Sequence, residues 1–257
     1  HDARAQAHLG AVELELGEVD AALADLLAAS NQDLASAEIR DAYGRALVAK
    51  GELPAAVEQL RKAVELEPGR AEHRLHLGQA LEKQGNAAEA IEAYRAAQAL
   101  APERVDGYEL LAAAYAGQNR CPEALPVLEK ALRLAPKEQR VRIAAADCKA
   151  KLGRHADAIA LYERVLKDDP AQVALYYRIG RAERDAGRPR QALPWFERAA
   201  RAEPKNAMPH YYLGFAYKER GQRARAVEAF RAYLAARPDA DDRADIGREI
   251  EDLGGRP

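Results

Sequence analysis

The chain has 257 residues, with 39 basic and 41 acidic side chains and a formal net charge of −2. A net charge so close to zero provides no bulk attraction to nucleic acid or to a membrane surface. Hydrophobic residues make up 48% of the chain, but no apolar run approaches the ~18 residues of a membrane-spanning helix. Much of the apolar content is alanine, which suits helices that pack closely together.

Small residues recur along the chain with a period of 34 residues, the interval from Gly10 to Gly44. A second series of glycine or asparagine follows seven places later, and a third series consists of prolines. A period of this length indicates a repeat architecture. The three series are Gly10, Gly44, Gly78, Ala112, Ala146, Gly180 and Gly214; Gly17, Gly51, Gly85, Asn119, Gly153, Gly187 and Gly221; and Pro68, Pro102, Pro136, Pro170, Pro204 and Pro238.

Each repeat unit has two amphipathic stretches with apolar residues at three- and four-residue spacing, which predicts two helices. The glycine or asparagine between them suits the left-handed residue that ends a helix, and the proline closes the second helix. Because a lone helical hairpin cannot bury its apolar face, we expect the units to stack as one continuous array. In chain order, the seven units are residues 3–36, 37–70, 71–104, 105–138, 139–172, 173–206 and 207–240.

The two ends of the predicted array differ. Residues 241–257 depart from the repeat, and Ile246, Ile250 and Leu253 fall on one stripe, which predicts a capping helix. No comparable helix precedes Ala3. Either the first repeat is its own polar cap, or the array continues upstream.

We number the places of each unit from its first residue. The eighth place is Gly or Ala in every unit, the twentieth is always Ala, and the twenty-fourth is large and apolar. This pattern resembles the tetratricopeptide repeat (TPR) family over nearly the whole length of the chain. The resemblance implies an all-α fold, a right-handed α-solenoid of seven helix–turn–helix repeats. The chain departs from the family at the fourth place, which is often Trp in the family but is not Trp in any unit here. Pro126 and Pro194 lie inside second helices, where we expect local bends.

The chain offers little for catalysis. It has no threonine, its only serines are Ser30 and Ser36, and no glycine-rich nucleotide loop occurs. His73 and His76 could share a helix face, but two histidines without a third ligand make a weak metal site. We interpret them as ordinary, partly exposed histidines. The prediction is a protein that is not an enzyme and has no cofactor or bound metal.

Cys121 and Cys148 lie in neighbouring predicted helices, so a disulfide between them is sterically conceivable, and two buried thiols are the alternative. We expect a cytoplasmic protein, or a periplasmic one if the two cysteines are bridged or an upstream signal was removed. The Ala- and Arg-rich composition favours a bacterial source. Bacterial TPR proteins of this kind often serve secretion, pilus or motility assemblies.

In TPR arrays the first helix of each repeat lines a concave groove. By this resemblance, the groove-facing places are largely acidic in repeats two to four and basic and aromatic in repeats five to seven. Arg178, Arg181 and Arg184 follow one helix at three-residue spacing and would suit carboxylates or a phosphate. The alternative is that the rings pack between repeats and the arginines are solvated. The predicted partner-binding residues are Arg140, Asp147, Tyr177, Arg178, Arg181, Arg184, Tyr211, Tyr212, Phe215 and Lys218.

The sequence therefore predicts an adaptor that holds an extended or helical segment of another protein. This segment is expected to be acidic with apolar anchors and to bind chiefly to repeats five to seven. Two alternatives remain. The acidic first repeat of one molecule could meet the basic last repeats of another in head-to-tail self-association. The arginines and tyrosines could instead hold nucleic acid, which the near-neutral net charge disfavours.

Overall fold

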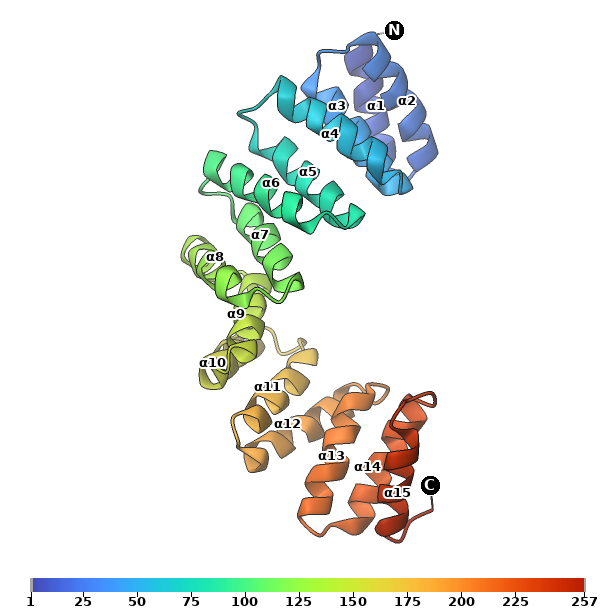
Figure 1. The fold of residues 1–257 in the computed structure, drawn as a ribbon, viewed down its shortest axis with the longest axis vertical. Coiled ribbons are helices and arrows are strands. Elements are labelled where there is room, and N and C mark those ends of the chain that lie inside the picture. The colour runs from blue at the N-terminus through green and yellow to red at the C-terminus, as the bar shows by residue number, and fades with distance from the viewer. Residues whose placement is uncertain (1, 257) are drawn as a thin grey trace. The chain divides into compact units, whose positions relative to one another are not determined.

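The computed structural model describes residues 2–256, and this part of the chain forms fifteen α-helices and no β-strand (Figure 1). The predicted all-α, helical-repeat fold is confirmed. The chain divides into two compact units, one ending at Pro136 and the other beginning at Lys137. The repeat pattern, which we expected to form one continuous array, contains no sign of this division.

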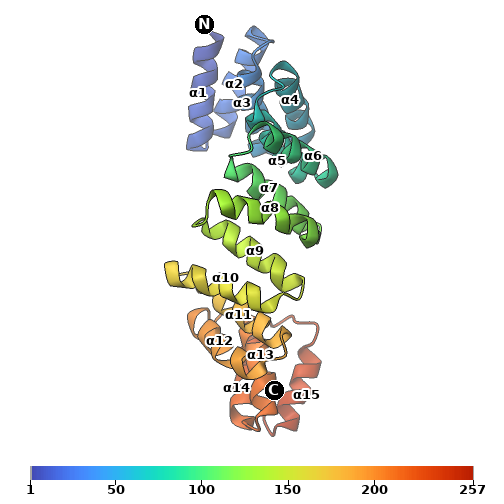
Figure 2. The ribbon, with the colours of Figure 1, turned by 90° about the vertical axis from the view of Figure 1, so that its left-hand side faces the viewer.

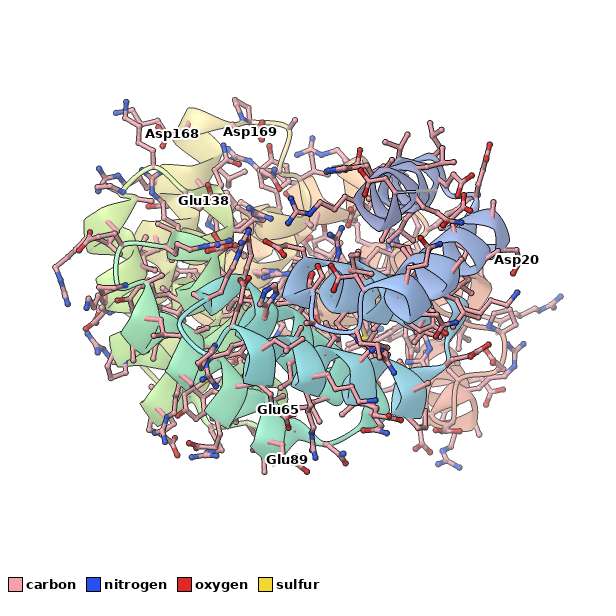
Figure 3. All side chains as sticks on the ribbon, turned by 90° about the horizontal axis from the view of Figure 1, so that it is seen from above. Asp20, Glu65, Glu89, Glu138, Asp168 and Asp169 are labelled. Atoms are coloured by element: carbon pink, nitrogen blue, oxygen red, sulfur yellow. The ribbon has the colours of Figure 1, made fainter. Side chains whose placement is uncertain are left out.

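The first unit holds four helical pairs. Each odd-numbered helix, the first helix of its pair, packs against the even-numbered second helix that follows. The second helices α2, α4 and α6 also contact the first helix of the next pair (Figure 2). Acidic side chains such as Asp20, Glu65 and Glu89 point into solvent from the second helices (Figure 3). The helices are α1 (Ala3–Leu16), α2 (Val19–Gln32), α3 (Ala37–Lys50), α4 (Leu53–Leu66), α5 (Ala71–Gln84), α6 (Ala87–Leu100), α7 (Val105–Gly117) and α8 (Cys121–Leu134).

The second unit holds three further pairs and a last single helix. Its pairs contact one another in the same way as those of the first unit. Both α8 and α12 continue through their internal prolines, Pro126 and Pro194. The helices are α9 (Gln139–Lys151), α10 (His155–Asp168), α11 (Ala174–Asp185), α12 (Pro189–Ala202), α13 (Ala207–Glu219), α14 (Arg223–Ala236) and α15 (Arg243–Asp252).

The close approach of the two helices in a pair explains the glycine at the eighth place. A Cβ added to Gly78 would lie 2.4 Å from the Tyr94 ring, and one added to Gly214 would lie 2.3 Å from the Phe230 ring. Real Cβ atoms do not approach other atoms so closely, and protein interiors leave little room for adjustment. The eighth place is therefore small because the twenty-fourth place of the same repeat is large.

The turn within each pair requires a left-handed residue. Gly85 has φ 91°, and Asn119, which replaces glycine in the fourth pair, has φ 57°. Asparagine tolerates this region better than most residues with a side chain. The substitution therefore keeps the turn, as the sequence pattern indicates.

Three side chains at the fourth place, those of Arg74, Tyr108 and His210, contact the connector that precedes their helix. The Tyr108 hydroxyl donates to the carbonyl oxygen of Pro102 at 2.8 Å, and Arg74 donates to that of Pro68 at 3.1 Å. His210 lies 3.1 Å from the carbonyl oxygen of Pro204 in the same way. These hydrogen bonds satisfy carbonyl groups that follow a helix end, which gives the polar fourth place a structural role.

The described ends of the array differ in what they expose. Ile246 and Ile250 of α15 are buried against the last pair, whereas Leu9, Val12 and Leu16 of α1 are 52%, 52% and 70% exposed.

Both cysteines are buried, and neither is a free thiol. Within residues 2–256, every helix falls short of the length and apolarity needed to cross a membrane.

Candidate functional site

The ten predicted partner-binding residues all lie on the first helices of the second unit. We call this set the aromatic–arginine face. Helix α9 carries two of them, and α11 and α13 carry four each, so the face covers three consecutive repeats within one unit. Its members are Arg140 and Asp147 on α9, Tyr177, Arg178, Arg181 and Arg184 on α11, and Tyr211, Tyr212, Phe215 and Lys218 on α13.

An ion pair joins α9 to α11. Nη1 of Arg178 donates to Oδ2 of Asp147, and the Tyr162 hydroxyl donates to Oδ1 of the same carboxylate at 2.5 Å. Burial, and then the nearby Asp147 charge, raise the pKa of Tyr162 far above its ordinary value. Because Arg178 and Asp147 are each about 40% exposed, solvent screens their attraction. The pair neutralises both charges and orients Arg178.

Stacked aromatic rings join α11 to α13. The rings of Tyr177 and Tyr212 are stacked with centroids 6.1 Å apart, and Tyr212 stacks on Phe196 of α12 at 5.0 Å. Tyr211 and Phe215 continue the cluster with an edge contact at 4.9 Å. Aromatic pairs of this kind stabilise a fold by more than the burial of their surface alone provides. Phe196 is buried, whereas the other four rings are half-buried, so these four both pack between repeats and form part of the surface.

Two arginines lie against these rings. The Arg184 guanidinium is 4.2 Å above the centroid of the Tyr212 ring, and its Nε donates to Asp185 at 2.9 Å. Arg181 is exposed, lies 6.0 Å from the centroid of Tyr177, and has no ion pair with a carboxylate in the part of the chain that the structure describes. An arginine on an aromatic face keeps its charge while its position is restrained. Arg181 is therefore a cation still able to bind an anion.

The remaining predicted residues lie at the edges of the face. Arg140 is 79% exposed and pairs with Glu138 at 3.3 Å. Lys218 pairs with Glu249 of α15, so its charge is already neutralised by the capping helix. Arg181 is thus the one basic residue of the face that forms no ion pair with a carboxylate among the described residues.

Two residues of this arrangement were outside the predicted set. Phe196 forms the base on which Tyr212 stacks, and Tyr162 holds the Asp147 carboxylate. Both occupy the large, apolar twenty-fourth place, where the sequence pattern indicates only a core role. The pattern did not reveal that Tyr162 contacts Asp147 on the first helix of its own repeat, or that Phe196 contacts Tyr212 on the first helix of the next repeat.

A different polar cluster joins α3 to α5 in the first unit. Nδ1 of His73 lies 2.9 Å from Oδ1 of Asp41, and Nδ1 of His76 lies 2.8 Å from the same oxygen. Asp41 is 6% exposed and His73 is 3% exposed, so the interpretation of His73 as partly exposed is wrong. The cluster is a hydrogen-bonded core feature. No group of three or more metal-ligating side chains occurs within residues 2–256.

The hydrogen bonds within this cluster shift the pKa values of Asp41 and His73. Burial alone would raise the pKa of Asp41, but the hydrogen bonds from His73 and His76 outweigh burial and lower it to about 2. Burial likewise opposes protonation of His73, but Asp41 and Glu67 together raise its pKa above 6.5. A carboxylate that accepts several hydrogen bonds stays ionised even when buried. The cluster therefore stabilises the α3–α5 contact from a buried position.

Comparison with known proteins identifies the family. One sequence profile described as tetratricopeptide repeat matches residues 42–105 and 177–241, and a second matches residues 115–181. No curated protein matches the chain.

Solved structures support the same fold. YrrB, described as a TPR protein with an unusual peptide-binding site, is 21% identical with a TM-score of 0.64, and the match covers 72% of this chain and 95% of YrrB. The C-terminal part of a TPR protein from Cytophaga hutchinsonii is 17% identical with a TM-score of 0.78, covering 93% and 98%. PilW, a type IV pilus biogenesis factor, is 18% identical with a TM-score of 0.68, covering 82% and 97%. The chain belongs to the tetratricopeptide repeat family.

Proposed function

We propose that this chain is a non-enzymatic adaptor that binds a segment of another protein on the aromatic–arginine face of its second unit. The observation that carries the proposal is the exposed Arg181, which has no carboxylate partner among the described residues and lies beside the stacked rings of Tyr177 and Tyr212. Tyrosine and arginine are the residues most enriched where binding energy concentrates. Membership of a family of protein-interaction repeats supports the same role.

The chemistry of the face favours an acidic segment with apolar side chains. A carboxylate of the partner can take bidentate hydrogen bonds from Arg181, and an apolar side chain can lie on the half-buried rings. Lys218 and Arg178 are already paired, so they add positive potential more than direct contacts. The pilus role of PilW is compatible with service in a bacterial secretion, pilus or motility assembly, which forms part of the proposal.

Affinity capture from a lysate of the source organism, read by mass spectrometry, tests the proposal. The wild type is compared with Arg181→Glu, which reverses the unpaired charge, and with Arg190→Glu as a matched control. Arg190 is exposed on α12, a second helix of the same unit. Because neither arginine forms an ion pair within residues 2–256, both variants should keep the helical content and unfolding midpoint of the wild type.

The expected result is a protein captured by the wild type and by Arg190→Glu, but about tenfold less by Arg181→Glu, as for loss of a central binding residue. Its capture should also weaken as the salt concentration rises. Equal capture by all three proteins would exclude the aromatic–arginine face as the binding site. Capture of the chain alone, in a salt-sensitive manner, would instead favour self-association.

A further inference from the structure

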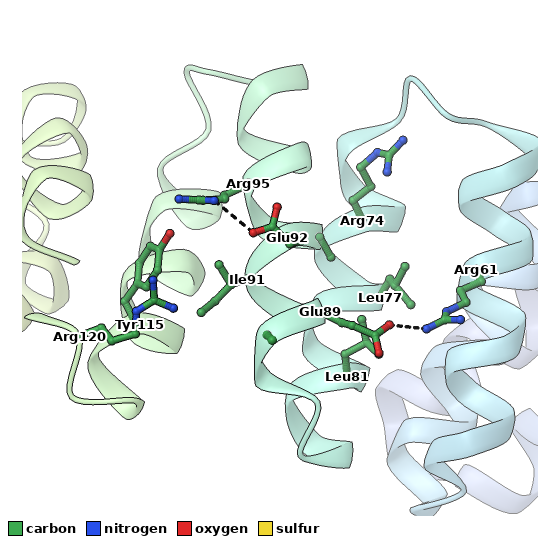
Figure 4. Close-up of a pocket in the computed structure, with 12 residues that line it drawn as sticks. Arg61, Arg74, Leu77, Leu81, Glu89, Ile91, Glu92, Arg95, Tyr115 and Arg120 are labelled. Carbon is green, nitrogen blue, oxygen red and sulfur yellow. Dashed lines mark hydrogen bonds and ion pairs between the residues drawn. The ribbon is translucent and has the colours of Figure 1, made fainter. Parts of the chain in front are cut away.

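A hollow of about 590 Å³ lies between the second helices α4 and α6 of the first unit, above the first helix α5, and extends to α7. Apolar side chains form its floor, and charged side chains surround it (Figure 4). It is separate from the aromatic–arginine face, which belongs to the second unit. Its main lining residues are Leu77, Leu81 and Ile91 on the floor, and Arg61, Arg74, Glu89, Glu92, Arg95 and Arg120 around the rim.

The second unit has an equivalent hollow that the chain fills with its own tyrosine. The Tyr217 hydroxyl donates to Oε1 of Glu197 at 2.7 Å and accepts from Nη2 of Arg225 at 2.7 Å. Arg225 also lies 4.1 Å above the Tyr217 ring and pairs with Glu197 at 3.0 Å. The remaining space there is about 350 Å³. An Arg–Glu pair across two second helices thus holds a phenol between them.

The first unit has the same charged pair without the tyrosine. By the repeat numbering, Arg61 and Glu89 occupy the places of Glu197 and Arg225, with the charges exchanged, and they pair at 2.5 Å. The place of Tyr217 is taken by Leu81, which has no ring or hydroxyl. Figure 4 shows Leu81 next to the Arg61–Glu89 pair. The hollow is correspondingly larger, and its polar groups match a phenol that the chain does not supply.

The far side of the hollow, beside α7, is already filled by Tyr115. This ring is 2% exposed, with the Arg120 guanidinium 4.8 Å and the Arg95 guanidinium 5.9 Å from its centroid. Tyr115 stands at the same place of its repeat as Leu81 and Tyr217. Tyrosine is therefore accommodated at this place in two repeats of the chain, one in each unit.

The rim of the hollow has one positive charge that no carboxylate neutralises. Arg61, Arg95 and Arg120 pair with glutamates. Arg74 instead donates to the carbonyl oxygen of Pro68, and its buried Nε has no hydrogen-bond partner among the described residues. An arginine in this state gains most from a carboxylate that can accept from more than one of its N–H groups.

We propose that this hollow binds an acidic segment of a partner protein, which inserts a tyrosine side chain over Leu81. The phenol donates to Glu89 and accepts from Arg61, as Tyr217 does with Glu197 and Arg225 in the second unit. A neighbouring carboxylate of the segment pairs with Arg74. Because the hollow and the aromatic–arginine face lie in different units, the chain can hold two partner segments at once, and this site does not depend on the function proposed above.

A short fluorescein-labelled peptide with one tyrosine between glutamates tests the proposal by fluorescence anisotropy. Matched peptides carry phenylalanine or alanine in place of tyrosine. We expect the tyrosine peptide to bind most tightly, the phenylalanine peptide less tightly, and the alanine peptide at least about tenfold more weakly, because the alanine peptide loses both the ring and the hydroxyl. No measurable binding of the tyrosine peptide, or equal binding of the tyrosine and alanine peptides, would overturn the proposal.

Leu81→Tyr provides the decisive variant, since it fills the hollow with a side chain that the same place accepts elsewhere. It should weaken binding of the tyrosine peptide by about tenfold. Arg74→Gln, a variant at the rim of the hollow, should weaken binding of the tyrosine peptide several-fold and reduce the salt dependence of this binding. If Leu81→Tyr does not fold, Arg74→Gln alone tests the proposal. Arg190→Glu, at an exposed arginine on a second helix of the other unit, should leave binding of the tyrosine peptide unchanged. If Leu81→Tyr folds, and both it and Arg74→Gln bind the tyrosine peptide as tightly as the wild type does, the assignment is contradicted.

Discussion

The contact between α3 and α5 in the first unit and the contact between α11 and α13 in the second join equivalent helices of consecutive repeats. In the first contact, the buried carboxylate of Asp41 is hydrogen-bonded to two histidines, His73 and His76. The second is made by stacked rings beside Arg181, a cation without a carboxylate partner in the described chain. One scaffold thus carries a contact whose buried carboxylate is held by hydrogen bonds within the chain, and a contact that lies beside a cation without a carboxylate partner among the described residues.

The difference shows where a repeat protein can change function without changing its fold. The helical pairs of both units share small eighth places and large twenty-fourth places, so their packing is the same. The side chains at the contacts between repeats differ, both on the first helices and on the second helices. A few substitutions there decide whether a repeat contact serves stability or binding.

The largest effect is expected from Asp41→Ala, which removes the acceptor shared by His73 and His76. Removing one partner of a buried, hydrogen-bonded charge leaves the others without a partner, and we expect a loss of about 3 kcal/mol in the free energy of unfolding. Urea unfolding followed by circular dichroism measures it. Asp20→Ala, at a carboxylate whose side chain is 82% exposed, is the control and should change little. A similarly small loss for Asp41→Ala would refute the view that this contact stabilises the first unit.

The same cluster predicts a pH dependence. The pKa of Asp41 falls from 3.8 to about 2 on folding, so its contribution, about 2 kcal/mol, is present above pH 3.8 and is lost as the pH falls towards 2. The pKa of His73 is raised on folding, so its contribution is present below pH 6.5 and is lost as the pH rises through the raised pKa. Unfolding midpoints measured across the pH range should therefore be highest between these limits.

Asp41→Asn is the control for this prediction, because asparagine does not titrate in this range. The variant should show a flatter dependence of the unfolding midpoint on pH. An unaltered pH profile would mean that Asp41 does not set the pH dependence of stability.

Substitution of the eighth-place glycine tests whether the scaffold is equally tight in both units. Gly78→Ala and Gly214→Ala each place a Cβ within about 2.4 Å of an aromatic ring. Overpacking of this kind costs about 1–3 kcal/mol, and we expect similar losses in the two units. Gly69→Ala, which meets no atom within 4 Å, is the control. Clearly unequal losses in thermal unfolding would show that the units differ in packing as well as in surface chemistry.

The smallest effect on stability is expected from Arg178→Gln. It breaks an ion pair with Asp147 whose members are each about 40% exposed, so the loss should stay below about 1 kcal/mol. Binding of the captured partner should weaken more, because the variant removes positive potential from the aromatic–arginine face. A large loss of stability with unchanged binding would place Arg178 in the scaffold and remove it from the binding site.

The choice of candidate site illustrates the reach of sequence reasoning. The repeat register places Tyr177, Arg181 and Tyr212 on first helices of consecutive repeats, and the structure brings these residues together. The register does not reveal that Lys218 is neutralised by Glu249 of α15 or that Arg178 is held by Asp147. Such pairings depend on side-chain rotamers and on distances between helices about thirty residues apart, which periodicity does not encode.

The buried cluster and the hollow of the first unit show the same limit. Asp41, His73 and His76 look like separate polar residues in the sequence, and Leu81 looks like an ordinary core residue. Their meaning depends on neighbours in other helices: a shared carboxylate in one case, and an Arg–Glu pair without its tyrosine in the other.

The sequence by itself determined the helical pairs, their register, the small and large places of the core, and the family. It could do so because each signal is local and recurs at a fixed interval, so that seven repeats reinforce one interpretation. Only the tertiary structure decided where the chain divides into units, which charges are already paired, and where a hollow remains unfilled. These properties arise from contacts between repeats, where a single side chain alters the outcome without altering the repeat.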